Sequence, residues 1–336
     1  MKKSSTAKGK SPELTEKNET PVICLENLCK RYGSLTALDS FNLTVGRGQI
    51  VGLLGPNGAG KSTMMNILTG YLSASSGRVL IDGIDVLEDP LAAKRKIGYL
   101  PEQPPLYPDM TVDEYLSFVF ALKGCTLPKE EHLADIVKAV RLTDVRGRLI
   151  RNLSKGYRQR VGIAQALVGD PPLLIFDEPT VGLDPKQIIE VRSLLRTLGR
   201  RHTVILSTHI LSEVQAVCER IVVIDRGCLI ADEATDSLSR AVGDNPRYRY
   251  AILGPGREIV SALRAKHGIA RCELLPEREG EAAVLLVESE RGVDVRRTVF
   301  GVCAASSWPI VGLQPVGAEL EDIFLALVGR EGGEKK

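Results

Sequence analysis

A glycine-rich stretch that ends in a lysine and two hydroxyl residues carries the clearest chemistry in this sequence. The phosphate-binding pattern G-x-x-x-x-G-K-[ST] is matched at every specified position by Gly55, Pro56, Asn57, Gly58, Ala59, Gly60, Lys61, Ser62 and Thr63. Glycines let the backbone wrap a phosphate chain and direct successive N–H groups at it. Lys61 adds a full charge for the β- and γ-phosphates, and the Ser62 hydroxyl is placed to bind the bridging magnesium ion. The stretch therefore predicts a nucleoside triphosphate site.

Two acids and a histidine follow apolar runs that are typical of buried strands. The run 173–176 ends in Asp177 and Glu178, and the run 203–208 ends before His209. Ligands of open α/β sheets bind at this carboxyl edge of the strands. Asp177 is suited to hold magnesium through a bound water, Glu178 to take a proton from an attacking water, and His209 to hydrogen-bond the γ-phosphate. Together they predict nucleotide hydrolysis, although a histidine at a strand end is by itself more often structural.

The elements that must position these residues alternate along the chain. A small antiparallel sheet is expected over 22–51, and the later alternation predicts an α/β fold with a mostly parallel sheet covered on both faces. Thr111 and Glu114 form a capping box at the start of one helix. The expected strands are 49–54, 78–81, 96–100, 173–177, 203–208 and 221–224, and the expected helices are 62–68, 111–122, one from 128, 153–168 and 185–198.

Composition shifts divide the chain into three parts. Residues 1–20 are polar and read as a disordered tail, residues 21–242 form the main domain, and residues 247–330 form a small α+β domain. The last part predicts a β-α-β-β-α-β order with a closing amphipathic helix at 319–328. It has no glycine-rich loop and no metal-ligand cluster, so a packing or dimerising role is favoured for it.

The overall composition excludes several classes of protein. A formal net charge of +2 over 336 residues offers no reason to expect a nucleic-acid binder. The seven cysteines are odd in number and form no C-x-x-C pair, which is typical of reduced thiols. No apolar run reaches the roughly 18 to 20 residues that cross a bilayer, so we expect a chain that is neither secreted nor membrane-spanning by itself.

The segment 153–159, with Ser154 and Gly156 at the start of a helix, resembles the signature motif of ATP-binding cassette (ABC) ATPases. The other marks of that family follow in order over about residues 22–240. In terms of the family they are Tyr32 as the adenine-stacking aromatic, 55–62 as Walker A, 173–177 as Walker B, Glu178 as the catalytic glutamate, Gly182-Leu183-Asp184 as the D-loop and His209 as the switch histidine. Tyr32 is expected on the loop between the first two strands, and taken alone it is more simply a surface tyrosine.

The resemblance implies the ABC ATPase cassette: a P-loop core with an antiparallel β subdomain and a helical subdomain over about 109–168. It implies ATP and Mg²⁺ as ligands and ATP hydrolysis as the activity. It also implies a head-to-tail dimer, because in this family the signature of one cassette completes the site of another. Ser154, Gly156 and Asp184 are then expected beside the ATP of a second subunit, most simply a second copy of this chain.

Two departures from the family pattern bear on the site. The usual signature has two glycines after the serine, whereas here Lys155 precedes Gly156 and Tyr157 follows it. At the Q-loop position stands Glu102, with Gln103 next to it. Either side chain is a candidate to approach the nucleotide and its magnesium ion. A carboxylate would bind the ion more strongly but add negative charge near the γ-phosphate.

The signature, the segment 106–108 and the segment 320–324 look like those of ATPase subunits of ABC-2 type exporters, in the gliding-motility and multidrug branches. That resemblance implies a peripheral protein on the cytoplasmic face of the inner membrane and a separate integral-membrane permease. The permease's coupling helix is then expected to dock around residues 102–110 and the helix from Thr111. Because the permease contacts the cargo in transporters of this design, this chain does not specify the cargo.

Two other classes fit parts of the pattern. A soluble ABC ATPase that acts on ribosomes or nucleic acid usually carries two cassettes or a long coiled-coil insertion, and neither occurs here. A small-molecule P-loop kinase would need an acceptor pocket and a lid in place of Ser154, Lys155 and Gly156. The sequence therefore favours the exporter subunit over both.

Overall fold

A six-stranded sheet carries the strands that end in the predicted acids and histidine. The computed structural model describes residues 20–235, 246–290 and 292–316. The strand order is β10-β9-β3-β8-β7-β6, and all neighbours are parallel except β9 and β10, which confirms the expected mostly parallel sheet. Every residue of β3, β7 and β8 is buried, which explains their apolar composition. The strands are β3 Ile50–Leu54, β6 Ile97–Leu100, β7 Leu173–Asp177, β8 Thr203–Thr208, β9 Arg220–Asp225 and β10 Cys228–Ala234.

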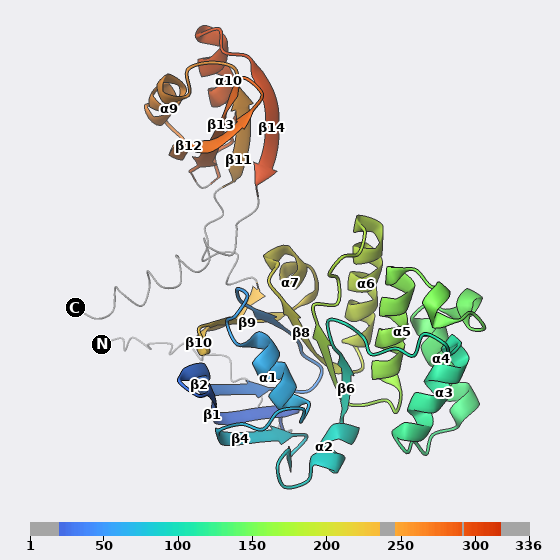
Figure 1. Cartoon of the computed structure of the whole chain (residues 1–336). Coiled ribbons are helices and arrows are strands. Elements are labelled where there is room, and N and C mark those ends of the chain that lie inside the picture. The colour runs from blue at the N-terminus through green and yellow to red at the C-terminus, as the bar shows by residue number, and fades with distance from the viewer. Residues whose placement is uncertain (1–19, 236–245, 291, 317–336) are drawn as a thin grey trace, which may run out of the picture.

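An antiparallel sheet of order β2-β1-β4-β5 forms the predicted β subdomain. Helix α1 (Lys61–Leu68) contributes Met64, Met65, Ile67 and Leu68 to one core with the antiparallel sheet and with one face of the central sheet. The first turn of this helix is thereby held beside the phosphate loop that precedes it (Figure 1). The strands are β1 Ile23–Tyr32, β2 Leu35–Val45, β4 Ser76–Ile81 and β5 Ile84–Asp85.

Three helices lie side by side in the part of the chain expected to be helical (Figure 1). Thr111 caps the first of them, and its hydroxyl and backbone N–H bond reciprocally with Glu114, so the predicted capping box is confirmed. Their apolar faces join the core on the other face of the central sheet. The helices are α3 Val112–Leu122, α4 Lys129–Ala139 and α5 Lys155–Leu167, and α6 Pro185–Leu198 and α7 Leu211–Val217 share that core.

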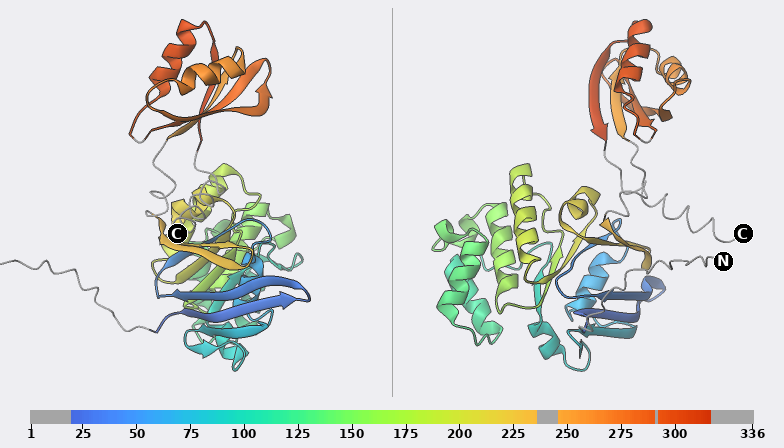
Figure 2. Two further views of the ribbon diagram at one scale, coloured as in Figure 1. Left: turned by 90° about the vertical axis from the view of Figure 1, so that its left-hand side faces the viewer. Right: turned by 180° about the vertical axis from the view of Figure 1, so that it is seen from behind.

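The C-terminal part has its own antiparallel sheet of order β12-β13-β11-β14. Both of its helices pack on one face and share a separate core with Tyr250, Ile252, Leu285 and Val287 (Figure 2). This arrangement is the split βαβ unit that the sequence predicts. The elements are β11 Arg247–Ile252, α9 Gly256–Arg264, β12 Ile269–Glu279, β13 Ala282–Ser289, α10 Arg296–Ala305 and β14 Ile310–Val316.

Some expectations fall outside this description or differ from it. The predicted tail and the helix at 319–328 lie outside the described residues, apart from Thr20. The short helices α2 (Pro90–Arg95) and α7 were not predicted, because six or seven residues are too few to show helical periodicity. No helix among the described residues is long and apolar enough to span a membrane.

Candidate active site

The glycine-rich loop connects β3 to α1 and depends on glycine at two positions. Gly60 has φ +110°, and a Cβ there would lie 2.6 Å from the Ala37 carbonyl oxygen. A Cβ on Gly55 would lie 2.3 Å from the Ile224 carbonyl oxygen. Any other residue at position 60 would have a strained backbone, and a Cβ at position 55 would collide with the Ile224 carbonyl. The loop geometry therefore requires glycine at both positions.

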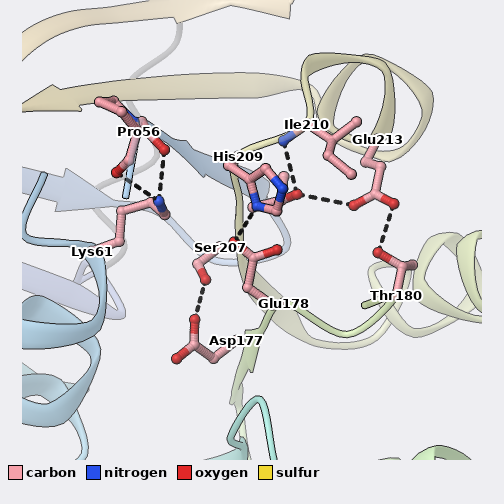
Figure 3. A network of polar contacts seen from close by, with 11 residues as sticks. Pro56, Lys61, Asp177, Glu178, Thr180, Ser207, His209, Ile210 and Glu213 are labelled. Atoms are coloured by element: carbon pink, nitrogen blue, oxygen red, sulfur yellow. Dashed lines mark hydrogen bonds and ion pairs between the residues drawn. The ribbon is translucent and has the colours of Figure 1, made fainter. Parts of the chain in front are cut away.

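Lys61 carries the positive charge of the loop. Its side chain is buried, and its ammonium donates hydrogen bonds to the carbonyl oxygens of Gly55 at 2.6 Å and Pro56 at 3.1 Å (Figure 3). Burial lowers the pKa of Lys61, while the charges of Glu178 and Asp177 raise it. The ammonium therefore lies inside the loop, within electrostatic range of both acids at the end of β7.

Asp177 and Glu178 leave β7 in different settings. The Ser207 hydroxyl donates a hydrogen bond to Asp177, and the two residues are direct partners in the register of β7 and β8. Glu178 has φ +47°, an uncommon conformation for a side chain of this size, and its backbone N–H donates to the Ser207 carbonyl at 3.1 Å. The strained backbone at Glu178 thus gives the two carboxylates different neighbours: Asp177 contacts Ser207, and Glu178 contacts His209.

The side chains of His209 and Glu178 are in direct polar contact. The histidine Nδ1 lies 3.0 Å from Glu178 Oε1 (Figure 3). Glu178 is 9% exposed, and its other oxygen, Oε2, is buried and has no hydrogen-bond partner among the described residues. A buried carboxylate oxygen without a donor is costly unless a ligand or water supplies one. Glu178 is therefore arranged to accept a hydrogen bond from a molecule that enters the site.

Magnesium fits the donor set at this place. Hard oxygen ligands are available from the Asp177 carboxylate and from the exposed Ser62 hydroxyl. No group of three or more His, Cys, Asp or Glu side chains in the described residues could hold a metal alone. Mg²⁺ is usually bound by one or two carboxylates together with substrate phosphates, so this sparse set suits an ion that arrives with a nucleotide.

The signature segment packs against the D-loop of the same chain. The Ser154 hydroxyl caps α5 by accepting from the Tyr157 N–H at 3.4 Å. Gly156 is buried, and a Cβ there would lie 2.6 Å from the Gln187 side-chain amide carbon. Asp184 caps α6 and accepts from the Gln187 N–H at 2.8 Å. The first turn of α5 and the first turn of α6 therefore pack against each other.

The remaining predicted residues lie separately from the group of Lys61, Glu178 and His209. Tyr32 is the last residue of β1, where a loop position was expected, is 47% exposed, and has the Lys30 ammonium 5.2 Å from its ring centre. Glu102 and Gln103 are exposed in a segment without helix or strand. Within the described chain, no hydrogen bond or ion pair joins these three to the acids or to Lys61.

Comparison with known proteins identifies the family. A model of the ABC transporter family matches residues 38–181. The linearmycin resistance ATP-binding protein LnrL of Bacillus subtilis (strain 168) is 32% identical over 309 residues, covering 91% of this chain and 97% of that protein. This chain belongs to the ABC transporter ATP-binding proteins. The ABC protein is also 32% identical to the Nod factor export ATP-binding protein I of Ralstonia nicotianae over 321 residues, covering 93% of this chain and 95% of that one.

Solved structures confirm the cassette fold of this ABC protein. The dimeric structure of MJ0796, a bacterial ABC transporter cassette, has a TM-score of 0.58 and 31% identity, and covers 63% of this chain and 98% of that one. The same cassette in a post-hydrolysis state with ADP and Pi has a TM-score of 0.58 and 30% identity, with the same coverage. The ABC protein is thus an ATPase with the fold that the resemblance predicted.

Sequence reasoning missed several polar residues that support the site. Ser207, Thr180, Thr208 and Glu213 all make buried hydrogen bonds next to the acids and the histidine. The first three are small hydroxyl residues within or next to motifs, and Glu213 follows His209 by four positions. A charged residue inside an otherwise apolar helix face is the signal that points to Glu213.

Proposed function

We propose that this ABC ATPase is the nucleotide-binding subunit of an ABC-2 type exporter and drives a separate membrane permease. The observation that carries the proposal is the pairing of His209 with Glu178 beside Lys61, together with an open aromatic groove at the predicted docking segment. The names of the relatives agree, since one is a Nod factor export protein and another is a lantibiotic transport ATP-binding protein of Streptococcus pyogenes. Such subunits work as peripheral proteins on the cytoplasmic face of the inner membrane.

The contacts of Lys61, Glu178 and His209 support a hydrolytic role for each of these side chains. Lys61 binds the β- and γ-phosphates, and Ser62 and Asp177 hold Mg²⁺, which neutralises phosphate charge when bound. Glu178 accepts a proton from the attacking water through its partnerless oxygen. His209 orients Glu178 through Nδ1, and its side chain is 43% exposed, which leaves the ring accessible to the γ-phosphate.

A second copy completes each site. The chain carries one phosphate loop and one signature, so Ser154 and Gly156 serve the ATP bound by a partner subunit. Helix α5 suits this role because its first turn contains no acidic residue and begins with Lys155, so its positive end is not neutralised. Asp184 caps α6, whose first turn packs against that of α5. The dimeric MJ0796 cassette is a precedent for such a pair.

The permease docks in a groove of about 660 Å³ that is lined mainly by aromatic and apolar side chains. Gln103 lies on its wall, which links the groove to the Q-loop position. Tyr107 packs edge-on against Phe118 with ring centres 5.4 Å apart, and Tyr71 is 84% exposed. A permease helix with apolar side chains matches this surface, since exposed aromatic groups favour an amphipathic partner.

The experiment is an affinity purification of the tagged chain from detergent-solubilised membranes, with wild type and Glu178→Gln, with and without ATP. Mass spectrometry identifies the partners. Recovery of a polytopic membrane protein in near-equal amount supports the proposal and identifies the permease. Recovery of ribosomes or nucleic-acid complexes in its place overturns the proposal and favours a soluble ABC ATPase.

A further inference from the structure

A buried glutamate lies behind the catalytic pair. Glu213 of α7 is 3% exposed and is not among the groups that act on the nucleotide in the proposed function. Its Oε1 accepts a hydrogen bond from the Thr180 hydroxyl at 2.6 Å, and its Oε2 accepts one from the Thr208 hydroxyl at 3.0 Å (Figure 3). Both threonines are themselves buried. One carboxylate therefore joins two segments that are far apart in the sequence.

Each threonine belongs to a segment that carries one member of the catalytic pair. Thr180 comes two residues after Glu178, and Thr208 directly precedes His209. The Thr208 hydroxyl also accepts from the Ile210 N–H at 3.1 Å, so this bond links the residues directly before and after His209. Glu213 is consequently bonded to the segment of the acid and to the segment of the histidine.

Among the described residues, Arg192 is the cation within ion-pair distance of the Glu213 carboxylate. Arg192 of α6 places Nη2 3.8 Å from Glu213 Oε1, and its buried Nε has no hydrogen-bond partner among the described residues. The 3.8 Å distance to Arg192 is long for an ion pair. The hydrogen bonds from Thr180 and Thr208 are shorter and therefore determine the position of the Glu213 carboxylate. Hydrogen bonds to a charged group in a buried setting are among the strongest in proteins.

We infer that Glu213 is a positioning residue for ATP hydrolysis. Its carboxylate accepts hydrogen bonds from Thr180 and Thr208 and so holds the two segments together. This keeps His209 Nδ1 at 3.0 Å from Glu178 Oε1. The hydrogen bond to Thr180 also stabilises the strained turn at Glu178. A φ of +47° is unfavourable for glutamate and persists only where neighbouring contacts hold the backbone in place. This inference rests on the proposed roles of Glu178 and His209, which the experiment checks separately.

The test compares substitutions that change hydrogen bonding but little volume. Thr180→Val removes one donor to the carboxylate, and Thr208→Val removes the other donor together with the acceptor of the Ile210 N–H. Glu213→Leu removes both acceptors, whereas Glu213→Gln keeps an oxygen for Thr208 and turns its amide toward Thr180, whose hydroxyl then accepts. The matched control is Thr197→Val, which removes a hydroxyl that bonds only to the Ser193 carbonyl within α6.

The readouts are kcat and KM for ATP hydrolysis and the melting temperature. We expect Thr208→Val to lower kcat about fivefold to tenfold with KM changed less than about twofold, since it removes a bond made to a charged group. Glu213→Gln should recover most of the kcat lost in Glu213→Leu, and Thr208→Val should cause no further loss in a His209→Ala background. Wild-type kcat in both threonine variants overturns the inference, as does equal loss in Glu213→Gln and Glu213→Leu. If His209→Ala and Glu178→Gln themselves hydrolyse ATP normally, the proposed function of the pair is wrong instead.

Discussion

The side chain of Lys155 lies across Gly182, so that a Cβ at Gly182 would be 1.9 Å from the lysine ammonium. Lys155 stands where the family signature usually has glycine, and Gly182 belongs to the D-loop with φ +69°. Gln159, on the same helix, donates to the Pro179 carbonyl at 2.9 Å. The unusual lysine thus joins the signature of this chain to its own D-loop.

We predict that Gly182→Ala displaces Lys155 and lowers ATPase activity. The positive φ costs an alanine about 1 to 2 kcal/mol, and the new methyl group removes the lysine from the loop. In a Lys155→Ala background the same substitution should reduce kcat less, because the contact is already absent. A double-mutant cycle on kcat measures this coupling. Equal effects of Gly182→Ala in both backgrounds would show that Lys155 and the D-loop act independently.

Glu178→Gln should abolish turnover and retain ATP binding. The amide cannot take a proton from water, and loss of a general base reduces kcat about 10² to 10⁴-fold. ATP-bound dimer should accumulate, as detected by size-exclusion chromatography with ATP. The control is Glu233→Gln, at an exposed position of β10, which should hydrolyse ATP like wild type. Wild-type turnover in Glu178→Gln would remove this residue from the role of base.

Stability should depend on pH through Lys123. Its ammonium donates to the Val168 carbonyl at 2.7 Å at the end of α5, and burial lowers its pKa to about 8 from the usual 10.5. Between about pH 8 and pH 10.5, Lys123 is more protonated in the unfolded chain than in the folded one. Its contribution therefore raises the free energy of unfolding as the pH rises through this range.

Lys123→Met lacks this pH-dependent contribution. Relative to the variant, wild type should gain free energy of unfolding from about pH 8 to about pH 10, on the order of 3 kcal/mol at most from the size of the pKa shift. Chemical denaturation of both proteins across this range measures the difference. Lys129→Met, at the exposed start of α4, is the control. A constant difference between wild type and Lys123→Met would contradict the prediction.

A charge in the aromatic groove should separate permease binding from hydrolysis. Phe118 is 37% exposed and packs on Tyr107, so Phe118→Glu puts a carboxylate where an apolar partner must desolvate it. Recovery of the permease should fall at least about tenfold, because the loss of about 1.4 kcal/mol of binding free energy already lowers the affinity tenfold. ATP hydrolysis by the purified chain should stay within about twofold of wild type. Phe300→Glu, on α10 and 66% exposed, is the matched control. Undiminished recovery with Phe118→Glu would exclude the groove as the docking site.

Much of the secondary structure was readable from sequence because its signals are local. The capping box at Thr111 and the apolar run before Asp177 each predict an element from neighbouring residues alone. The order of elements after residue 246 also predicts a split βαβ unit. Its strand order β12-β13-β11-β14 came only from the structure, since pairing partners are set by packing between distant segments.

By itself the sequence determined the chemistry of the phosphate loop, because Gly60 and Lys61 act through backbone conformation and charge within one short stretch. It also determined the residue types at the strand ends. Only the tertiary structure decided how they meet: the parallel register that pairs Asp177 with Ser207 brings His209 beside Glu178. The same packing places Glu213 between Thr180 and Thr208, which no spacing in the sequence indicates. Hydrogen bonds of this kind depend on which buried surfaces pack together, and that is a property of the folded chain as a whole.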